Sequence, residues 1–134
     1  MNYLQDTTVL VLGLGESGLA MARWCAGIGA QIRVWDSREA PALTGALAEH
    51  APAAVWVRGA LTNDALAGVK LVLKSPGLSP FDAAIAGVLQ HAVATGIPVQ
   101  GELDLFARAL ADLKTERGYA PKVLAITGTN GKTT

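Results

Sequence analysis

The stretch Thr8–Gly18, with the sequence TVLVLGLGESG, decides the fold class of this chain. Its first five residues are β-branched or apolar, which is typical of a strand buried on both faces of a parallel sheet. The remainder has the pattern Gly-x-Gly-x-x-Gly, and a helical pattern follows from about Ser17 to Ile28. A strand, a glycine-rich turn and a helix in this order predict the first unit of an α/β nucleotide-binding fold.

Apolar runs and helical patterns continue to alternate as far as Leu113. Helices are expected at about 17–28, 44–49, 81–94 and 102–113, with a short helical turn near 63–66. The expected strands are Thr8–Leu12, Gln31–Trp35, Ala54–Val57, Leu71–Lys74 and Ile97–Gln100. Because strands separated by helices connect in parallel, we predict a Rossmann-like, doubly wound parallel sheet of about five strands.

Polar residues follow several of these strands at the edge where the carboxyl ends meet. The glycine turn would present the backbone N–H groups of Glu16, Ser17 and Gly18 at a helix start, where they can bind phosphate. Asp36 ends the second strand, near the spacing at which a carboxylate accepts hydrogen bonds from ribose hydroxyls. The candidate crevice residues are Gly15, Glu16, Ser17, Gly18, Asp36, Ser37, Arg38, Ser75 and Gly77.

Simpler interpretations of these residues stay open. The glycine turn could merely pack a strand against a helix, with Asp36 as a helix cap or a solvated acid. The Ser17 hydroxyl could either contact a ligand or cap the helix. Glu16 would repel a bound diphosphate unless its side chain turned outward into water.

A second glycine motif ends the chain, directly after the apolar run Val123–Ile126. Gly-x-x-Gly-Lys-Thr after a strand is typical of a phosphate-binding loop, in which Lys132 contacts the terminal phosphates and the Thr133 hydroxyl holds Mg²⁺. A full Walker A pattern would have Gly at position 126, which is Ile here, so the loop is a shortened variant. The candidate ATP-binding residues are Gly128, Thr129, Asn130, Gly131, Lys132, Thr133 and Thr134.

The chain therefore divides into three predicted parts. A Rossmann-like domain covers residues 1–112, and a charged linker with Gly118 and Pro121 covers 113–121. Residues 122–134 would be the first strand and phosphate-binding loop of a truncated ATPase domain, because the helix that such a loop needs does not follow. We therefore expect the sequence to be a fragment of a longer protein.

Composition indicates a cytoplasmic chain with no affinity for nucleic acid. Hydrophobic residues make up 51% and charged residues 16%, with eleven acidic against eleven basic residues and no block of one sign. The run Val9–Leu12 is too short for a signal peptide or a membrane span.

Cys25 is the lone cysteine and lies among apolar residues, which favours a buried thiol over a nucleophile. His50 and His91 lack metal-ligand spacing.

Five segments together resemble the Mur ligases of bacterial cell-wall synthesis. The tail is similar to Mur ligases and folylpolyglutamate synthases alike, whereas the front loop with Ser-Pro-Gly is similar to the D-glutamate-adding branch. The resemblance spans the whole chain, in the segments Gly13–Gly18, Asp36–Arg38, Lys74–Gly77, Gly101–Phe106 and Ala125–Thr134.

This resemblance implies a three-domain, ATP-dependent, amide-forming ligase of peptidoglycan biosynthesis, which serves cell shape and division. Residues 1–112 would bind the UDP part of UDP-N-acetylmuramoyl-L-alanine. The substrate carboxylate would attack ATP to give an acyl phosphate, from which the amine of D-glutamate displaces phosphate. The implied cofactors are ATP and Mg²⁺, and the fragment alone would bind only the UDP moiety and be inactive.

The resemblance also implies roles for single residues. Lys132 and Thr133 would be catalytic, the first at the ATP phosphates and the second at Mg²⁺. In the crevice, Glu16 and Ser17 would lie at the diphosphate, Asp36, Ser37 and Arg38 near the uridine, and Gly77 at the uracil.

Two other functions are compatible with the front loop. An NAD(P)-dependent oxidoreductase domain would use the same glycine turn and Asp36, although it would not need the Lys132 loop. A non-catalytic nucleotide-sensing module would bind a nucleotide in the crevice and signal through the linker.

Overall fold

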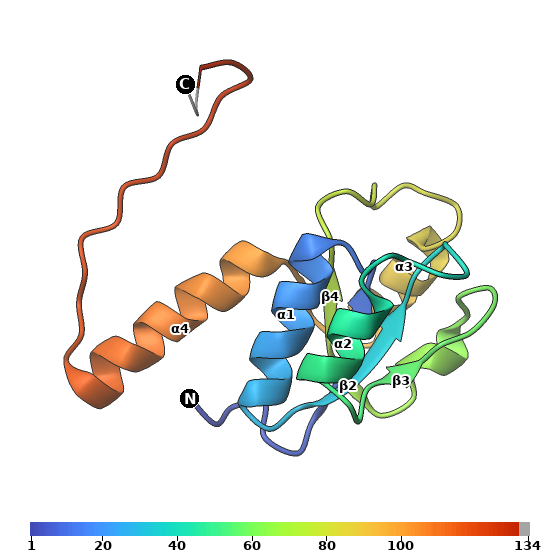
Figure 1. Cartoon of the computed structure of the whole chain (residues 1–134), viewed down its shortest axis with the longest axis horizontal. Helices are drawn as coiled ribbons and strands as arrows, with labels where there is room; N and C mark the ends of the chain where they lie inside the picture. Colours follow the sequence, from blue (N-terminus) through green and yellow to red (C-terminus); the bar gives the residue numbers. More distant parts are fainter. Residues whose placement is uncertain (132–134) are drawn as a thin grey trace.

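The computed structural model describes residues 1–131, and its centre is a five-stranded sheet (Figure 1). Neighbouring strands are parallel in every pairing of this sheet, and their order is β3-β2-β1-β4-β5. The strands are β1 (Thr8–Leu12), β2 (Gln31–Trp35), β3 (Val55–Trp56), β4 (Val69–Lys74) and β5 (Val99–Gln100). Because the strand order reverses between β1 and β4, the sheet is doubly wound, and the predicted Rossmann-like fold is confirmed.

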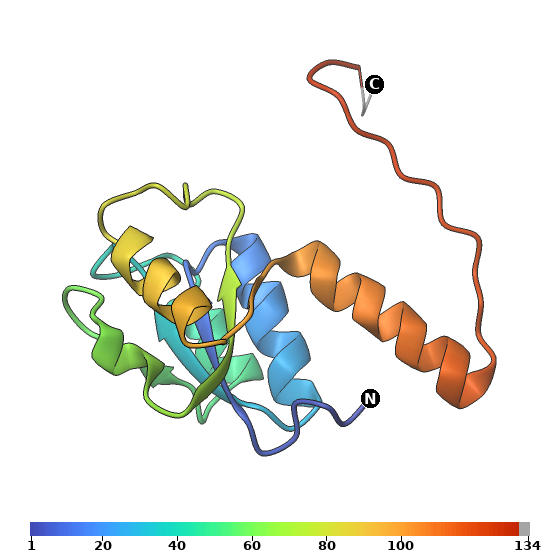
Figure 2. The same cartoon turned by 180° about the vertical axis from the view of Figure 1, so that it is seen from behind.

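Helices cover both faces of the sheet (Figures 1 and 2). The helices are α1 (Glu16–Gly27), α2 (Thr44–His50), α3 (Ala86–Ala94) and α4 (Glu102–Arg117), with a 3₁₀ turn η1 (Asn63–Leu66). One hydrophobic cluster joins the sheet to α1, α2 and Leu105 of α4, and another joins it to α3 and η1. Strand β1 supplies Val9 and Val11 to the first cluster and Leu10 and Leu12 to the second, all at 0% exposure. This double burial explains the uninterrupted apolar run of β1.

Two of the three glycines in the Gly-x-Gly-x-x-Gly motif, which joins β1 to the first turn of α1, are required by the backbone itself. Gly13 has a φ of 89°, which L-residues rarely adopt. A Cβ atom on Gly18 would lie 1.9 Å from the Gly13 carbonyl oxygen. Gly15 differs, because its φ is −89° and a Cβ there would meet nothing within 4 Å. The turn thus needs its first and third glycines to fold, and its second glycine leaves open space in front of α1.

Several predicted element boundaries were wrong. Helix α3 begins at Ala86 and not near Phe81, because local bonds hold 79–84 in turns: the Phe81 N–H donates to Ser79 Oγ and the Ala84 N–H to Asp82 Oδ1. Strands β3 and β5 contain two residues each instead of four, and β4 begins at Val69 instead of Leu71. Helix α4 continues to Arg117 and ends at Gly118, whose φ of 66° provides a left-handed cap. The first residues of the predicted linker are therefore helical.

Residues 118–131 contain no helix or strand and extend away from the sheet (Figures 1 and 2). The strand predicted at 123–126 does not form, since no strand in the described part of the chain pairs with it. Val123, Leu124 and Ile126 are 56%, 93% and 77% exposed. Lys132, Thr133 and Thr134 lie outside the described residues, so the predicted phosphate-binding loop is described only over 128–131.

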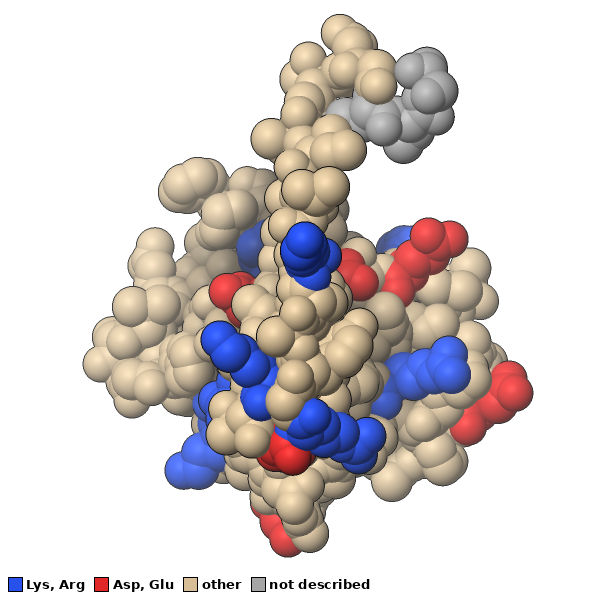
Figure 3. Space-filling view, turned by 90° about the vertical axis from the view of Figure 1, so that its left-hand side faces the viewer, with Lys and Arg blue, Asp and Glu red and all other residues tan. Residues whose placement is uncertain are grey.

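The surface carries charges of both signs. On the face with α4 and the tail, Lys and Arg side chains are accompanied by Asp and Glu side chains (Figure 3). In the middle of α4, Arg108 forms an ion pair with Asp112 at 2.9 Å and lies 3.9 Å from the ring centroid of Tyr3. Farther along the helix, the N-terminal amino group of Met1 pairs with Glu116. The amino-terminal segment is thereby attached to α4.

We predict that Gly18→Ala destabilises the fold by at least about 2 kcal/mol, because its methyl group would overlap the Gly13 carbonyl and force backbone shifts. Gly15→Ala is the matched control and should change the free energy of unfolding by less than about 0.5 kcal/mol. Urea denaturation followed by circular dichroism measures both. Equal stabilities for the two variants would contradict the close approach of α1 to the β1 turn.

Candidate functional site

A crevice lies at the carboxyl-end edge of the sheet, where the loops after β1, β2 and β4 meet. Its volume is about 450 Å³, and it is lined by Gly13, Gly15, Glu16, Ser17, Asp36, Ser37, Arg38, Ser75, Pro76, Gly77 and Leu78. Except for the buried Gly18, every predicted crevice residue lines it. The loops after β1 and β4 flank the point where strand order reverses, which is the usual ligand position in open α/β sheets.

The start of α1 presents backbone N–H donors at the crevice. The first N–H groups of a helix have no partner within it, and the cap residue Gly15 has no side chain to bond them. The positive end of the helix dipole lies at the same place. Glu16 has an exposed side chain, and the open space before Gly15 lets a ligand approach the backbone closely. This end of α1 can therefore bind a phosphate group through its backbone.

Asp36 connects the loops after β1 and β2. Its Oδ2 accepts a hydrogen bond from the Leu14 N–H at 2.7 Å, and its two oxygens accept the backbone N–H, Nε–H and Nη2–H of Arg38 at 2.8 to 2.9 Å. The Arg38 guanidinium and these N–H groups lower the pKa of the carboxyl to about 2, although burial to 3% exposure opposes the shift. Asp36 is thus neither a helix cap nor a solvated acid, because its carboxylate fixes the loops.

Ser75 and Lys74 hold the third wall of the crevice. The buried Ser75 hydroxyl donates to the Gly13 carbonyl at 3.0 Å, which joins the loop after β4 to the glycine turn. The Lys74 ammonium donates to the carbonyls of Ser75 and Leu78 at 3.0 and 2.6 Å and so braces the Ser-Pro-Gly turn. Gly77 is exposed at the tip of this turn. Lys74 had no predicted role, and its position directly before Ser-Pro-Gly was the available signal.

Ser17 has a different partner from those considered in the sequence. Its hydroxyl donates to Glu102 Oε2 at 2.9 Å, and α1 has no side-chain cap. The capping alternative was therefore wrong. The bond joins the first turn of α1 to the first residue of α4, so the N-terminus of α4 lies beside the crevice.

The predicted ATP-binding residues lie apart from the crevice as far as they are described. Residues 128–131 are exposed on the extended tail, and Gly131 has a φ of 76°, a conformation that glycine favours. Within residues 1–131, no group of three or more His, Cys, Asp or Glu residues is arranged to hold a metal ion. No helix in residues 1–131 is long and apolar enough to span a membrane.

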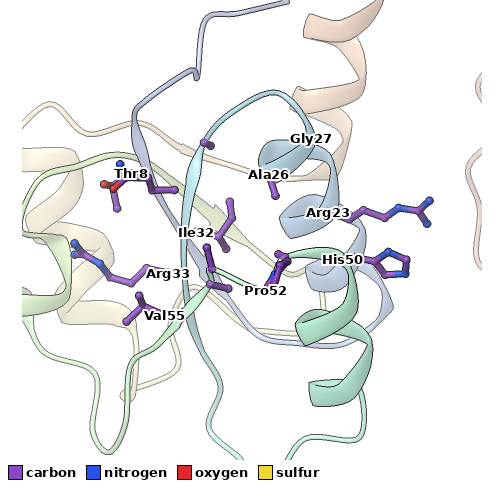
Figure 4. A pocket seen from close by; sticks show the side chains of 14 residues that line it. Thr8, Arg23, Ala26, Gly27, Ile32, Arg33, His50, Pro52 and Val55 are labelled. Atoms are coloured by element: carbon purple, nitrogen blue, oxygen red, sulfur yellow. The ribbon is translucent and has the colours of Figure 1, made fainter.

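A larger cavity of about 770 Å³ lies at the opposite edge, where β1, β2 and β3 begin (Figure 4). Figure 4 shows that the Arg23 and His50 side chains extend away from the strands. The Arg33 guanidinium is bound to the carbonyls of Ala65 and Ala67 at 2.7 and 2.9 Å. Because its polar side chains do not converge, this cavity is the weaker candidate despite its size.

Cys25 lies in neither cavity and is fully buried, as predicted. Burial raises the pKa of its thiol to about 12, so the reactive thiolate is scarce near neutral pH. The prediction that Cys25 is a buried core side chain and not a nucleophile is confirmed.

Together, the sheet and the glycine turn define a Rossmann-like α/β domain. A shikimate dehydrogenase from Aquifex aeolicus is similar in fold, with a TM-score of 0.57 and 16% identity over 89% of this chain and 51% of that chain. The family model for the Mur ligase MurD-like N-terminal domain matches residues 7–101. The chain belongs to this family.

Curated relatives are similar over almost the whole chain. The "UDP-N-acetylmuramoylalanine--D-glutamate ligase" of Ralstonia nicotianae is 64% identical over 98% of this chain, and that of Albidiferax ferrireducens is 56% identical over 100%. The chain spans 26% of the length of each of these relatives.

We predict that Asp36→Asn lowers the free energy of unfolding at pH 7 by about 1–2 kcal/mol, after allowance for solvent screening. Folding lowers the carboxyl pKa from 3.8 to about 2, so its stabilisation is complete above about pH 4 and is lost as the pH falls toward 2. The difference between wild type and variant should shrink over that range in urea denaturation. Asp64→Asn, at an exposed acid of η1, is the control, and a constant difference from pH 7 to 2 would contradict the assignment.

Proposed function

We propose that this chain is the substrate-binding N-terminal part of an ATP-dependent ligase of cytoplasmic peptidoglycan precursor synthesis. The full protein would add D-glutamate to UDP-N-acetylmuramoyl-L-alanine through an acyl phosphate. The observation that carries the proposal is the crevice at the switch point of a MurD-like N-terminal domain. The names of the relatives support the reaction, and the chain itself would bind only the UDP moiety.

The chemistry of the crevice suits a nucleoside diphosphate. The diphosphate would lie against the N–H groups of 16–18, with the exposed Glu16 side chain directed to water. The Arg38 side chain, which is 58% exposed, supplies a cation at the same crevice. The uridine would lie near residues 36–38 and Gly77, with Asp36 acting mainly by fixing Arg38 and Leu14.

The domain division and the cofactors belong to the same proposal. Residues 1–112 would form the UDP-substrate domain, 113–121 the linker, and 122–134 the start of the ATP-binding domain. Residues 128–134 would hold ATP, with Lys132 at its phosphates and Thr133 at Mg²⁺. The turn conformation of Gly131 is compatible with a phosphate loop, but the strand that would support it is absent from the described residues. The proposal for ATP therefore depends on the sequence motif and the family.

We predict that UDP-N-acetylmuramoyl-L-alanine and UDP raise the Tm of the chain in a thermal-shift titration, whereas NAD⁺ and ATP do not. A ligand that binds only the folded state stabilises it by mass action, by about 2.7 kcal/mol at a hundredfold excess over Kd. Gly15→Ala should keep the ligand-free Tm and lose most of the shift, because its methyl group would occupy the open space at the diphosphate. Gly45→Ala, in α2 and away from the crevice, is the control. Selective stabilisation by NAD⁺ would refute the proposed ligand.

We also predict that these 134 residues form no amide bond when supplied with ATP, Mg²⁺, UDP-N-acetylmuramoyl-L-alanine and D-glutamate. The reason is that the chain spans 26% of the length of the related ligases. Phosphate release and product chromatography measure turnover, with the full-length Ralstonia nicotianae relative as positive control. Turnover by the chain alone would overturn this prediction without affecting the binding proposal.

A further inference from the structure

We propose that the Glu102 carboxylate competes with an anionic ligand of the crevice for the hydroxyl of Ser17. A phosphate would then bind fully only after the Glu102 side chain has turned into water. The inference rests on the proposed function, because it concerns the ligand of that same crevice. It starts from the bond that joins α1 to α4, in which the Ser17 hydroxyl donates to Glu102 Oε2 at 2.9 Å.

The Ser17 hydroxyl has a single proton to donate. Ser17 is the second residue of α1 and lines the crevice, so its side chain lies where a phosphate at the helix start would bind. An ionised phosphate oxygen is an acceptor and binds to donors. Because one proton cannot serve the Glu102 carboxylate and a phosphate at full strength, a phosphate that takes the hydroxyl must displace Glu102 from it.

The second conflict is between two negative charges. Two oxygens that contact one hydroxyl lie about 4–5 Å apart by ordinary hydrogen-bond geometry. A carboxylate and a phosphate at that separation repel each other by Coulomb's law. Within residues 1–131, no Lys or Arg forms an ion pair with Glu102 that would offset this repulsion. Glu102 therefore opposes an anion at the start of α1 as long as it stays bonded to Ser17.

The backbone at Glu102 is fixed, whereas its side chain is free to rotate. The Gly101 N–H donates to Asp104 Oδ2 at 2.8 Å, which holds the first turn of α4. Leu105, 4% exposed, anchors the same turn in the hydrophobic core. The Glu102 side chain is exposed, so it can leave Ser17 for water without a movement of α4. Rotation of one side chain is therefore sufficient to resolve the competition.

The test is calorimetric titration of the 134-residue chain with inorganic diphosphate and, separately, with UDP. We expect Glu102→Ala to bind both ligands on the order of tenfold more tightly than the wild type. Glu102→Gln keeps the shape and loses the charge, so it should show most of the same gain. Glu49→Ala, which removes an exposed acid of α2 away from the crevice, is the matched control and should bind as the wild type does. Circular dichroism verifies the fold of each variant.

Ser17→Ala tests whether the effect passes through the hydroxyl. In that variant Glu102 loses its partner on α1 and can remain in water, so a further Glu102→Ala change should raise the affinity by less than about threefold. An undiminished gain in the Ser17→Ala background would overturn the competition. So would a gain confined to Glu102→Ala and absent from Glu102→Gln, or an affinity of Glu102→Ala that is unchanged or weaker.

The competition and the proposed function fail separately in this test. If inorganic diphosphate shows the gain and UDP binds to no variant, the proposed function is refuted and the competition stands. UDP binding to the wild type without a gain in Glu102→Ala would do the reverse. Absence of binding by both ligands in every variant would overturn both.

Discussion

The close approach of helix α1 to the turn after β1 is the constraint on which the crevice depends. Only a hydrogen atom fits on Gly18 beside the Gly13 carbonyl, so the first turn of α1 lies directly against the end of the central strand. This position brings the Gly13 carbonyl to the Ser75 hydroxyl and the Leu14 N–H to Asp36. The loops after β1, β2 and β4 are therefore fixed to one another before any ligand arrives.

These bonds also decide which chemistry the crevice presents. The Asp36 carboxylate and the Gly13 carbonyl, which could accept hydrogen bonds from a ligand, are engaged within the protein. The helix start and the exposed Arg38 guanidinium supply donors and positive charge. A crevice built in this way favours an anion over a neutral sugar. A glycine motif shared with dehydrogenases can thus stand beside side chains of a different polarity, so the motif alone does not identify a ligand.

The sequence predicted the features that depend on local pattern and missed those that depend on distant partners. Strand β1 was predictable because four of its five residues are buried. The crevice was predictable because parallel strands end at one edge of the sheet. The role of Asp36 was not predictable, since its partner Leu14 lies 22 positions away in the sequence. Helix α3 starts late because short polar side chains bond their own backbone, which periodicity does not reveal. The run at 123–126 has strand composition, yet a strand requires a neighbour to pair with.

The double burial of β1 has a consequence for how the chain finds its register during folding. In a sheet with one wet face, a slip of one residue moves apolar side chains into water and is rejected by solvation. Strand β1 has apolar residues on both faces, so polarity alone cannot distinguish the native alignment from its neighbours. The alignment must be selected by shape and by the glycine turn at its end, where the Gly13 N–H donates to the Trp35 carbonyl at 2.7 Å. The turn that lines the crevice therefore also sets the alignment of the central strand.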